Sequence, residues 1–391
     1  MTPEVRLLRG DQAAEAARQS AVSFGIAFDD DLIQRHHGWI AQGELWGVTD
    51  EDRVLAHCRI TTVDHWFGGQ RVPCQHVASV AVPPEHRGRG VASALMGATT
   101  MRGAEGLGLS LLFPATTRLY RKLGWEHAGT YTVYRLAAWD VDLPEPRPPA
   151  MRPAGGDADW AAIIACYDRA ATQAIAMAAR PPEVWEQLRK ATYHYVHDGA
   201  EPGSLSAYAL FDHLRAPGDW RYTIAIQDWA ATSAAGLRAL LGFIASHGSL
   251  GKDATFCGGW PEPWSLLVGE QHVRVDKAMR WMARGLDLQA AVAHRGFPPG
   301  LSAHVTIAVE DPLLPKASGP WRLEVNGGRG VLEPTGAAEV RLDARAVGPL
   351  FTGFRDPAQL ALAGLVSGPP GALALLAAAF AGPPPTMVDF F

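Results

Sequence analysis

Residues 79–96 read SVAVPPEHRGRGVASALM, and they are the most informative stretch of the chain. Residues 79–82 continue a predicted strand that begins near His76 and is rich in β-branched residues. Pro83 and Pro84 end this strand, because proline cannot donate a hydrogen bond to a β-ladder. A basic turn with two glycines follows, and apolar residues at helical spacing begin at Val91. The stretch therefore predicts a strand, a glycine turn and a helix, in that order.

The glycine turn is suited to binding a diphosphate. The first amides of a helix have no partner inside the helix, and the helix dipole places partial positive charge there. Gly88 and Gly90 would let a ligand approach the backbone, while Arg87 and Arg89 add positive charge. The spacing fits neither a dinucleotide-binding G-x-G-x-x-G nor a P-loop. The alternative is a solvated basic turn in front of an ordinary helix.

The composition predicts a globular protein of several domains. At about 150 residues per domain, 391 residues suggest two to four domains. A net charge of −5 gives no support to a nucleic-acid partner. Four separated cysteines without a C-x-x-C motif favour a reduced, cytoplasmic protein. We expect no metal site, because no histidine pair has metal-ligand spacing, and no membrane segment, because a Gly-Pro-Pro-Gly break at 368–371 interrupts the most apolar tract.

The sequence pattern changes twice along the chain. Strands and helices alternate up to about residue 141, and a proline-rich connection is predicted over 142–153. The opening pattern then recurs, since RPAGGD at 152–157 resembles RLLRGD at 6–11, which suggests a second copy of the same fold. Its predicted strand-to-helix junction at 227–232 has no glycine and carries Asp228 where a diphosphate would lie. From about residue 286, strands followed by helices predict an α+β domain.

The motif Arg87-x-x-Gly90-x-Ala92, which follows a V-x-V strand, resembles the acetyl-CoA signature of the GNAT N-acetyltransferases. Together with the second copy and the α+β end of the chain, it resembles the Eis (enhanced intracellular survival) family. The resemblance implies tandem GNAT folds of the α/β class, the second without a cofactor site, and a sterol-carrier-protein-like α+β domain. The expected divisions are 1–145, 146–285 and 286–391.

The resemblance also implies an activity and an assembly. The family transfers an acetyl group from acetyl-CoA to primary amines of small cationic substrates, including several positions on aminoglycosides. It assembles as a homohexamer. The chain departs from the family pattern at Ile26, where the family carries an acidic residue.

Residue roles follow from the same resemblance. Tyr120 would be the general acid, and Phe391 would be the general base through its terminal α-carboxylate. The residues expected to bind acetyl-CoA are Val80, Ala81, Val82, Arg87, Gly88, Arg89, Gly90, Val91, Ala92, Ser93, Ala115 and Thr116. Phe24, Phe28 and Trp39 are candidates for lining the acceptor pocket, with core packing as the alternative for all three.

Other interpretations stay open at this point. Tyr120 could be a packing aromatic residue, and the acidic run 29–31 could be a solvated loop or could attract a polycationic amine. The acyl donor could carry a longer chain. The protein could also be a carrier whose last domain binds an apolar ligand while the CoA site is regulatory. A carrier would bind fatty acids or sterols without releasing CoA, whereas the enzyme would release a free thiol.

Overall fold

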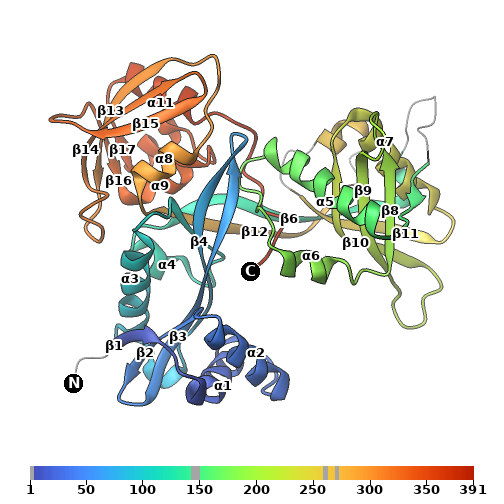
Figure 1. The fold of residues 1–391 in the computed structure, drawn as a ribbon, viewed down its shortest axis with the longest axis horizontal. Helices are drawn as coiled ribbons and strands as arrows, with labels where there is room; N and C mark the ends of the chain where they lie inside the picture. Colours follow the sequence, from blue (N-terminus) through green and yellow to red (C-terminus); the bar gives the residue numbers. More distant parts are fainter. Residues whose placement is uncertain (1–3, 142–149, 259–262, 269–272) are drawn as a thin grey trace.

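A computed structural model of the chain describes residues 4–141, 150–258, 263–268 and 273–391. Three lobes are visible in Figure 1. The first (residues 4–137) and the second (residues 152–285) share one continuous twelve-stranded sheet, and the third (residues 286–391) has its own five-stranded sheet. The predicted connection at 142–153 lies mostly outside the described residues; its last part, Arg152–Pro153, forms a short strand.

The first lobe follows the predicted alternation of strands and helices. Its strands β2 and β3 form an antiparallel pair. The elements of this lobe are β1 (Glu4–Leu7), η1 (Gly10–Gln12), α1 (Ala13–Phe24), α2 (Asp30–Ala41), β2 (Leu45–Asp50), β3 (Arg53–Phe67), β4 (Gln70–Ala81), η2 (Pro84–His86), α3 (Val91–Gly103), β5 (Leu109–Leu112), α4 (Thr117–Arg121) and β6 (Glu126–Ala137).

The second lobe repeats the same succession of elements. After η3 (Ala138–Asp140) it contains β7 (Arg152–Pro153), α5 (Gly156–Thr172), α6 (Pro182–Leu188), β8 (Tyr193–Asp198), β9 (Leu205–Leu214), β10 (Tyr222–Ala231), α7 (Ala234–Ser246), β11 (Gly251–Gly258), η4 (Pro263–Leu267) and β12 (Arg274–Gly285). The predicted junction at 227–232 was wrong, because residues 227–231 belong to β10. A bulge between Ile226 and Asp228 shifts the pairing of β10 with β9, and Asp228 lies on the buried face of the strand.

The final strands of the two lobes are interleaved. The strand β12 of the second lobe lies between β5 and β6 of the first lobe. Met282 of β12 is paired with Leu112 of β5, and β6 in turn pairs with β11 of the second lobe. The fully buried Trp281 packs so closely on Gly129 of β6 that a Cβ there would lie 2.2 Å from the indole ring. Glycine at 129 is therefore required for this interleaving.

The third lobe is an α+β unit, as predicted. It contains α8 (Leu288–His294), β13 (Ala303–Glu310), β14 (Gly319–Asn326), β15 (Arg329–Pro334), β16 (Val340–Asp343), α9 (Ala344–Phe351), α10 (Pro357–Leu362), β17 (Val366–Ser367) and α11 (Pro370–Ala379). Ion pairs that join its sheet and helices to the rest of the molecule include a buried one between Arg284 and Asp311 and one between Arg345 and Glu126. None of the helices in the described parts of the chain has both the length and the apolar character needed to cross a membrane.

The last residues leave the third lobe and run between the other two. In Figure 1 the C-terminus lies near the centre of the molecule, beside the interleaved strands. The Thr386 N–H donates to the Ile175 carbonyl at 2.8 Å, and the Met387 N–H donates to the Thr130 carbonyl at 3.4 Å. Met387 is fully buried. The tail is thus part of the packed structure and ends at the sheet of the first lobe.

Candidate active site

The site is centred on the point where β4 and β5 separate. The two strands run parallel only as far as the pair Val77–Leu112, while β4 continues to Ala81 and there pairs with β3. A bulge in β4, where Ser79 has φ 50°, marks the separation. Within the described residues, the β5-facing backbone groups beyond Val77 have no strand partner. They can pair with an extended ligand, as an added strand would.

The turn after β4 has the geometry of a diphosphate site. Gly88 and Gly90 have φ of +75° and +79°, values that glycine adopts without strain. A Cβ at either position would meet no atom within 4 Å, so the space above the turn is open. Gly90 caps the 13-residue helix α3, whose first amides point into this space. Arg87 donates from Nε to the Val82 carbonyl at 2.9 Å and so ties the turn to the end of β4.

The predicted cofactor residues fall on four neighbouring segments. These are the end of β4, the glycine turn, the first turn of α3 and the loop between β5 and α4. Val91 is buried beneath the turn, while Gly88, Arg89 and Gly90 are exposed. Ala115 and Thr116 follow β5, and Thr116 is the N-cap residue of α4. The unpaired end of β4 and the open glycine turn are therefore compatible with acetyl-CoA.

Substitution of Gly90 by alanine is expected to weaken acetyl-CoA binding. A side chain at φ +79° costs about 1–2 kcal/mol, and its methyl group would enter the open space at the turn. The KM for acetyl-CoA should rise about tenfold or more, as measured by initial rates. Gly106→Ala is the matched control, because Gly106 has φ +82° and equally open surroundings. If both variants raise the KM equally, the turn is not the diphosphate site.

Tyr120 is buried next to the separation of β4 and β5. Its side chain is 5% exposed, and its ring packs edge-on against Trp125 with centroids 6.2 Å apart. It shares one apolar cluster with Val77 and Leu112, and Val80 and Val82 pack against that cluster. Burial, and to a lesser extent the nearby Cys58 thiol, raise the pKa of Tyr120 to about 12. The phenol therefore keeps its proton at neutral pH and can donate it.

Phe391 reaches the same separation from the other side of the sheet. Its ring stacks on His76 of β4, with centroids 3.6 Å apart and planes inclined by 9°. It also packs edge-on against Phe113, which follows β5. Because side chains alternate along a strand, His76 and Val77 point to opposite faces. Phe391 and Tyr120 therefore lie against opposite faces of the sheet at one point.

Nothing in the sequence indicates that several further residues contact the C-terminal tail. His76 Nε2 lies 2.6 Å from Nε2 of His65, whose Nδ1 donates to the Ala176 carbonyl at 2.8 Å. Burial lowers the pKa of His65 to about 4 and that of His76 well below its usual value, so the pair is neutral. Phe390 packs against Phe113 with centroids 4.6 Å apart. These contacts join residues far apart in the chain, which local patterns do not predict.

The three acceptor-pocket candidates lie in different surroundings. Phe24 and Phe28, 45% and 43% exposed, flank the loop between α1 and α2. Trp39 instead packs against His36, with centroids 4.7 Å apart, and the Arg59 guanidinium lies 5.0 Å from its ring. Core packing accounts for the position of Trp39, whereas the two phenylalanines are accessible.

The first residue of the acidic run 29–31 caps the helix α2. Asp29 is the N-cap of α2 and accepts the Leu32 N–H at 2.8 Å. Asp30 and Asp31 occupy the first helical turn, where negative charge is favourable. Among the described residues, no three histidine, cysteine or acidic side chains are grouped so that they could hold a metal ion.

Comparisons with known proteins agree with this geometry. Residues 4–128 and 176–284 each match a family model described as an acetyltransferase (GNAT) domain, and residues 288–388 match a sterol carrier protein domain. Eis1 from Mycobacterium abscessus is 24% identical, with a TM-score of 0.81 over 100% of both chains. That likeness shows the shared fold and confirms the Eis-like architecture expected from the sequence.

Two solved GCN5-related N-acetyltransferases are similar from end to end. The structure from Anabaena variabilis is 27% identical and has a TM-score of 0.90 over 100% of both chains. The structure from Kribbella flavida is 31% identical and has a TM-score of 0.85, covering 100% of this chain and 99% of that one. With both GNAT units matched and this identity maintained over its whole length, the chain belongs to the GCN5-related N-acetyltransferases.

Proposed function

We propose that the protein transfers an acetyl group from acetyl-CoA to a primary amine of a small cationic substrate. The observation that carries this proposal is the placement of Tyr120 and Phe391 on opposite faces of the sheet where β4 and β5 separate. The reaction needs a base that accepts a proton from the amine nitrogen and an acid that donates one to the leaving sulfur. Two groups on opposite faces of the sheet, with the thioester between them, would meet both needs.

The backbone supplies the binding groups. Acetyl-CoA, when bound, contributes an activated acetyl thioester. The backbone of Val80 and Val82 would pair with its pantetheine arm, and the amides of residues 88–93 would bind its diphosphate. A backbone N–H near Val82 would stabilise negative charge that develops on the acetyl oxygen.

The terminal carboxylate and one side chain would transfer the protons of the reaction. A primary amine is largely protonated at neutral pH, so the terminal carboxylate of Phe391 would accept a proton from the amine nitrogen. The Tyr120 hydroxyl would donate its proton to the leaving sulfur. Its buried, neutral phenol is suited to this, because a thiolate that forms in a dry site is a strong proton acceptor.

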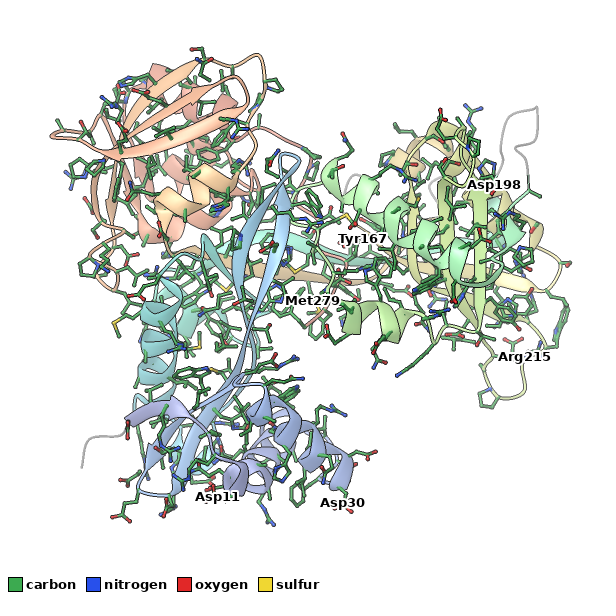
Figure 2. The ribbon with its side chains drawn as sticks, viewed as in Figure 1. Asp11, Asp30, Tyr167, Asp198, Arg215 and Met279 are labelled. Atoms are coloured by element: carbon green, nitrogen blue, oxygen red, sulfur yellow. The ribbon has the colours of Figure 1, made fainter. Side chains whose placement is uncertain are left out.

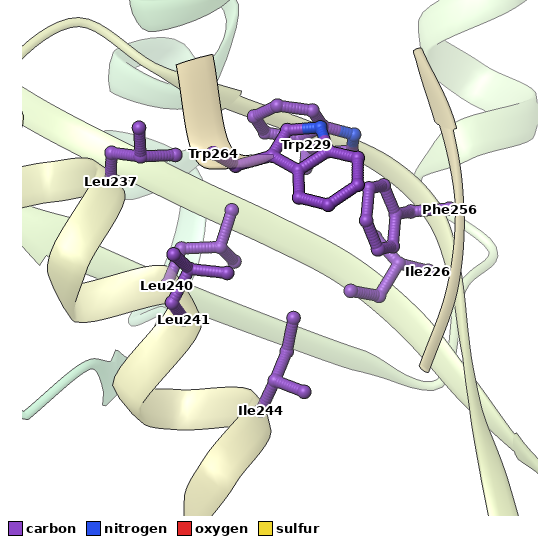
Figure 3. Close-up of a pocket in the computed structure, with 8 residues that line it drawn as sticks. All are labelled: Ile226, Trp229, Leu237, Leu240, Leu241, Ile244, Phe256 and Trp264. Atoms are coloured by element: carbon purple, nitrogen blue, oxygen red, sulfur yellow. The ribbon is translucent and has the colours of Figure 1, made fainter. Parts of the chain in front are cut away.

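The alternative, a carrier whose last domain binds an apolar ligand, receives little support from the cavity in that domain. The apolar cavity of the third lobe, between α8, α9 and its sheet, has a volume of about 40 Å³. Ligand pockets usually measure about 300–1,000 Å³. The apolar gap under α7 in the second lobe, shown in Figure 3, holds only about 10 Å³. Neither cavity accommodates a fatty acid or a sterol.

The substrate and assembly belong to the same proposal. Aminoglycosides, acetylated at several amines, are the candidate acceptors, and the exposed Phe24 and Phe28 are candidate acceptor contacts. We further propose a cytoplasmic homohexamer. Exposed large apolar side chains on the described surface, including Trp139, Trp220 and Leu362, offer contact area for such an assembly.

Thiol release from acetyl-CoA with a panel of amines tests the activity, and Tyr120→Phe tests the acid. The variant should lower kcat about 100-fold and leave the KM for acetyl-CoA unchanged. Because the pKa of Tyr120 is about 12, deprotonation of this group should not reduce kcat between pH 7 and 10. Tyr195→Phe in the second lobe is the control. Absence of thiol release with every amine, combined with stoichiometric fatty-acid binding, would favour the carrier.

A further inference from the structure

We infer that Arg180 is a positioning residue for the terminal carboxylate, and that the second lobe holds the tail on which that carboxylate lies. This inference rests on the proposed role of the carboxylate as base. Its physical basis is a buried ion-pair triad formed by Arg180, Asp228 and Asp389.

The Arg180 guanidinium connects the second lobe to the tail. Its side chain is 2% exposed. Two of its nitrogens donate to the two carboxylate oxygens of Asp228 in β10, at 2.7 and 2.8 Å. Its Nε donates to the two oxygens of Asp389, at 2.9 and 3.1 Å. Asp389 is separated from Phe391 by a single residue, so this ion pair fixes the chain close to the proposed base.

The second lobe holds Arg180 firmly without help from the tail. The Tyr208 hydroxyl donates to Asp228 at 2.5 Å. The Tyr167 ring lies 3.8 Å from the guanidinium, and its hydroxyl donates to the Ala178 carbonyl at 2.8 Å. Figure 2 shows Tyr167 on α5, on the side of the second lobe that faces the centre of the molecule. The receptor for Asp389 is therefore already organised by these contacts.

The position of Asp228 in the second lobe corresponds to the strand separation of the first lobe. In the first lobe, the bulge near Ser79 marks the place where β4 leaves β5. In the second lobe, β10 has a bulge at Asp228, just beyond its last pair with β11, Ala225–Thr255. The same opening of the sheet thus occurs in both lobes. In the second lobe, Asp228 at this opening binds Arg180, which in turn binds Asp389 of the tail.

The anchor is needed because chain ends usually fray. Backbone hydrogen bonds hold the tail at Thr386 and Met387, and the second of these is long, at 3.4 Å. A base displaced by about 1 Å can reduce a rate on the order of 100-fold. The charged anchor at Asp389 restricts the tail between these backbone bonds and the ring of Phe391.

Asp389→Ala tests the inference without leaving a buried charge unpaired, because Asp228 still neutralises Arg180. The kcat should fall between about 10- and 100-fold with the KM for acetyl-CoA unchanged. Carboxypeptidase should release Phe391 at least about tenfold faster, because the tail would leave its site more often. Asp389→Asn, which keeps one acceptor oxygen, should recover part of both effects.

The matched control is Asp198→Ala. Arg152 bridges Asp159 and Asp198 much as Arg180 bridges its two carboxylates, but on the surface. Figure 2 shows Asp198 on the outer side of the second lobe, away from Tyr167. This variant should match the wild type in kcat and in carboxypeptidase release.

Three results for Asp389→Ala would overturn the inference. The first is that kcat and the carboxypeptidase release of Phe391 both match the wild type. The others are faster release of Phe391 with unchanged kcat, and reduced kcat with unchanged release of Phe391. Failure of the proposed function is distinguishable, since it would appear in the wild type as no thiol release with any amine. The carboxypeptidase measurement would then still decide whether Arg180 anchors the tail.

Discussion

A chain extended by a few residues after Phe391 is expected to lose nearly all acetyl transfer while still binding acetyl-CoA. The extension converts the α-carboxylate of Phe391 into an amide, which cannot accept a proton. The ring of Phe391 can keep its place on His76. Loss of a general base typically lowers a rate by about 10²- to 10⁴-fold. Thiol release and calorimetric binding of acetyl-CoA measure the two effects separately.

Two controls separate the carboxylate from the rest of the tail. Phe391→Leu keeps the carboxylate and should lose much less activity than the extended chain. An equal extension at the N-terminus should have no effect. Equal activity in the native and C-terminally extended chains would exclude the terminal carboxylate as the base. The base would then be sought among Asp29, Asp30, Glu44 or a bound water.

The largest loss of stability is expected from Arg284→Met. Arg284 and Asp311 form an ion pair at 2.8 Å, with side chains only 1% and 3% exposed. Arg284 also donates to the Leu123 carbonyl at 2.6 Å, just after the helix that carries Tyr120. Its removal leaves a buried carboxylate without its partner, which costs about 3–5 kcal/mol. Urea unfolding should show this as a lower midpoint.

Comparison with a surface ion pair tests the cause. Arg322→Met in the third lobe removes an exposed pair with Glu333 and should change the free energy of unfolding by less than about 1 kcal/mol. Arg284→Met combined with Asp311→Leu should recover much of the loss, because no buried charge then stays unpaired. If the double variant is as unstable as the single one, lost packing rather than the unpaired carboxylate is responsible.

The sequence predicted those parts of the fold that local chemistry determines. The α+β end of the chain was predictable, because alternating apolar residues in β13 and β14 are bounded by glycine and proline. The turn between β4 and α3 was also predictable, because two prolines end the strand and two glycines precede the helix. Its left-handed glycines at 88 and 90 fit that expectation.

What the sequence did not predict depends on contacts between distant segments. Residues 274–285 have a strand pattern, but nothing in that pattern indicates β5 and β6 as their neighbours. Asp228 was assigned to a turn because a polar residue interrupts the alternation, whereas a bulge and a buried arginine accommodate it within a strand. The role of Phe391 came from family resemblance, and its contact with His76 required the structure.

The interleaving of β6 and β12 imposes an order on folding during synthesis. The first lobe's own strands are complete at Ala137, yet the gap between β5 and β6 is filled only by β12, about 150 residues later. At about 5–20 residues per second, the ribosome takes roughly 7–30 s to deliver it. Until then β5 presents an unpaired edge, which is prone to aggregation. The first two lobes therefore complete their shared sheet together, and we expect neither to fold as an independent module.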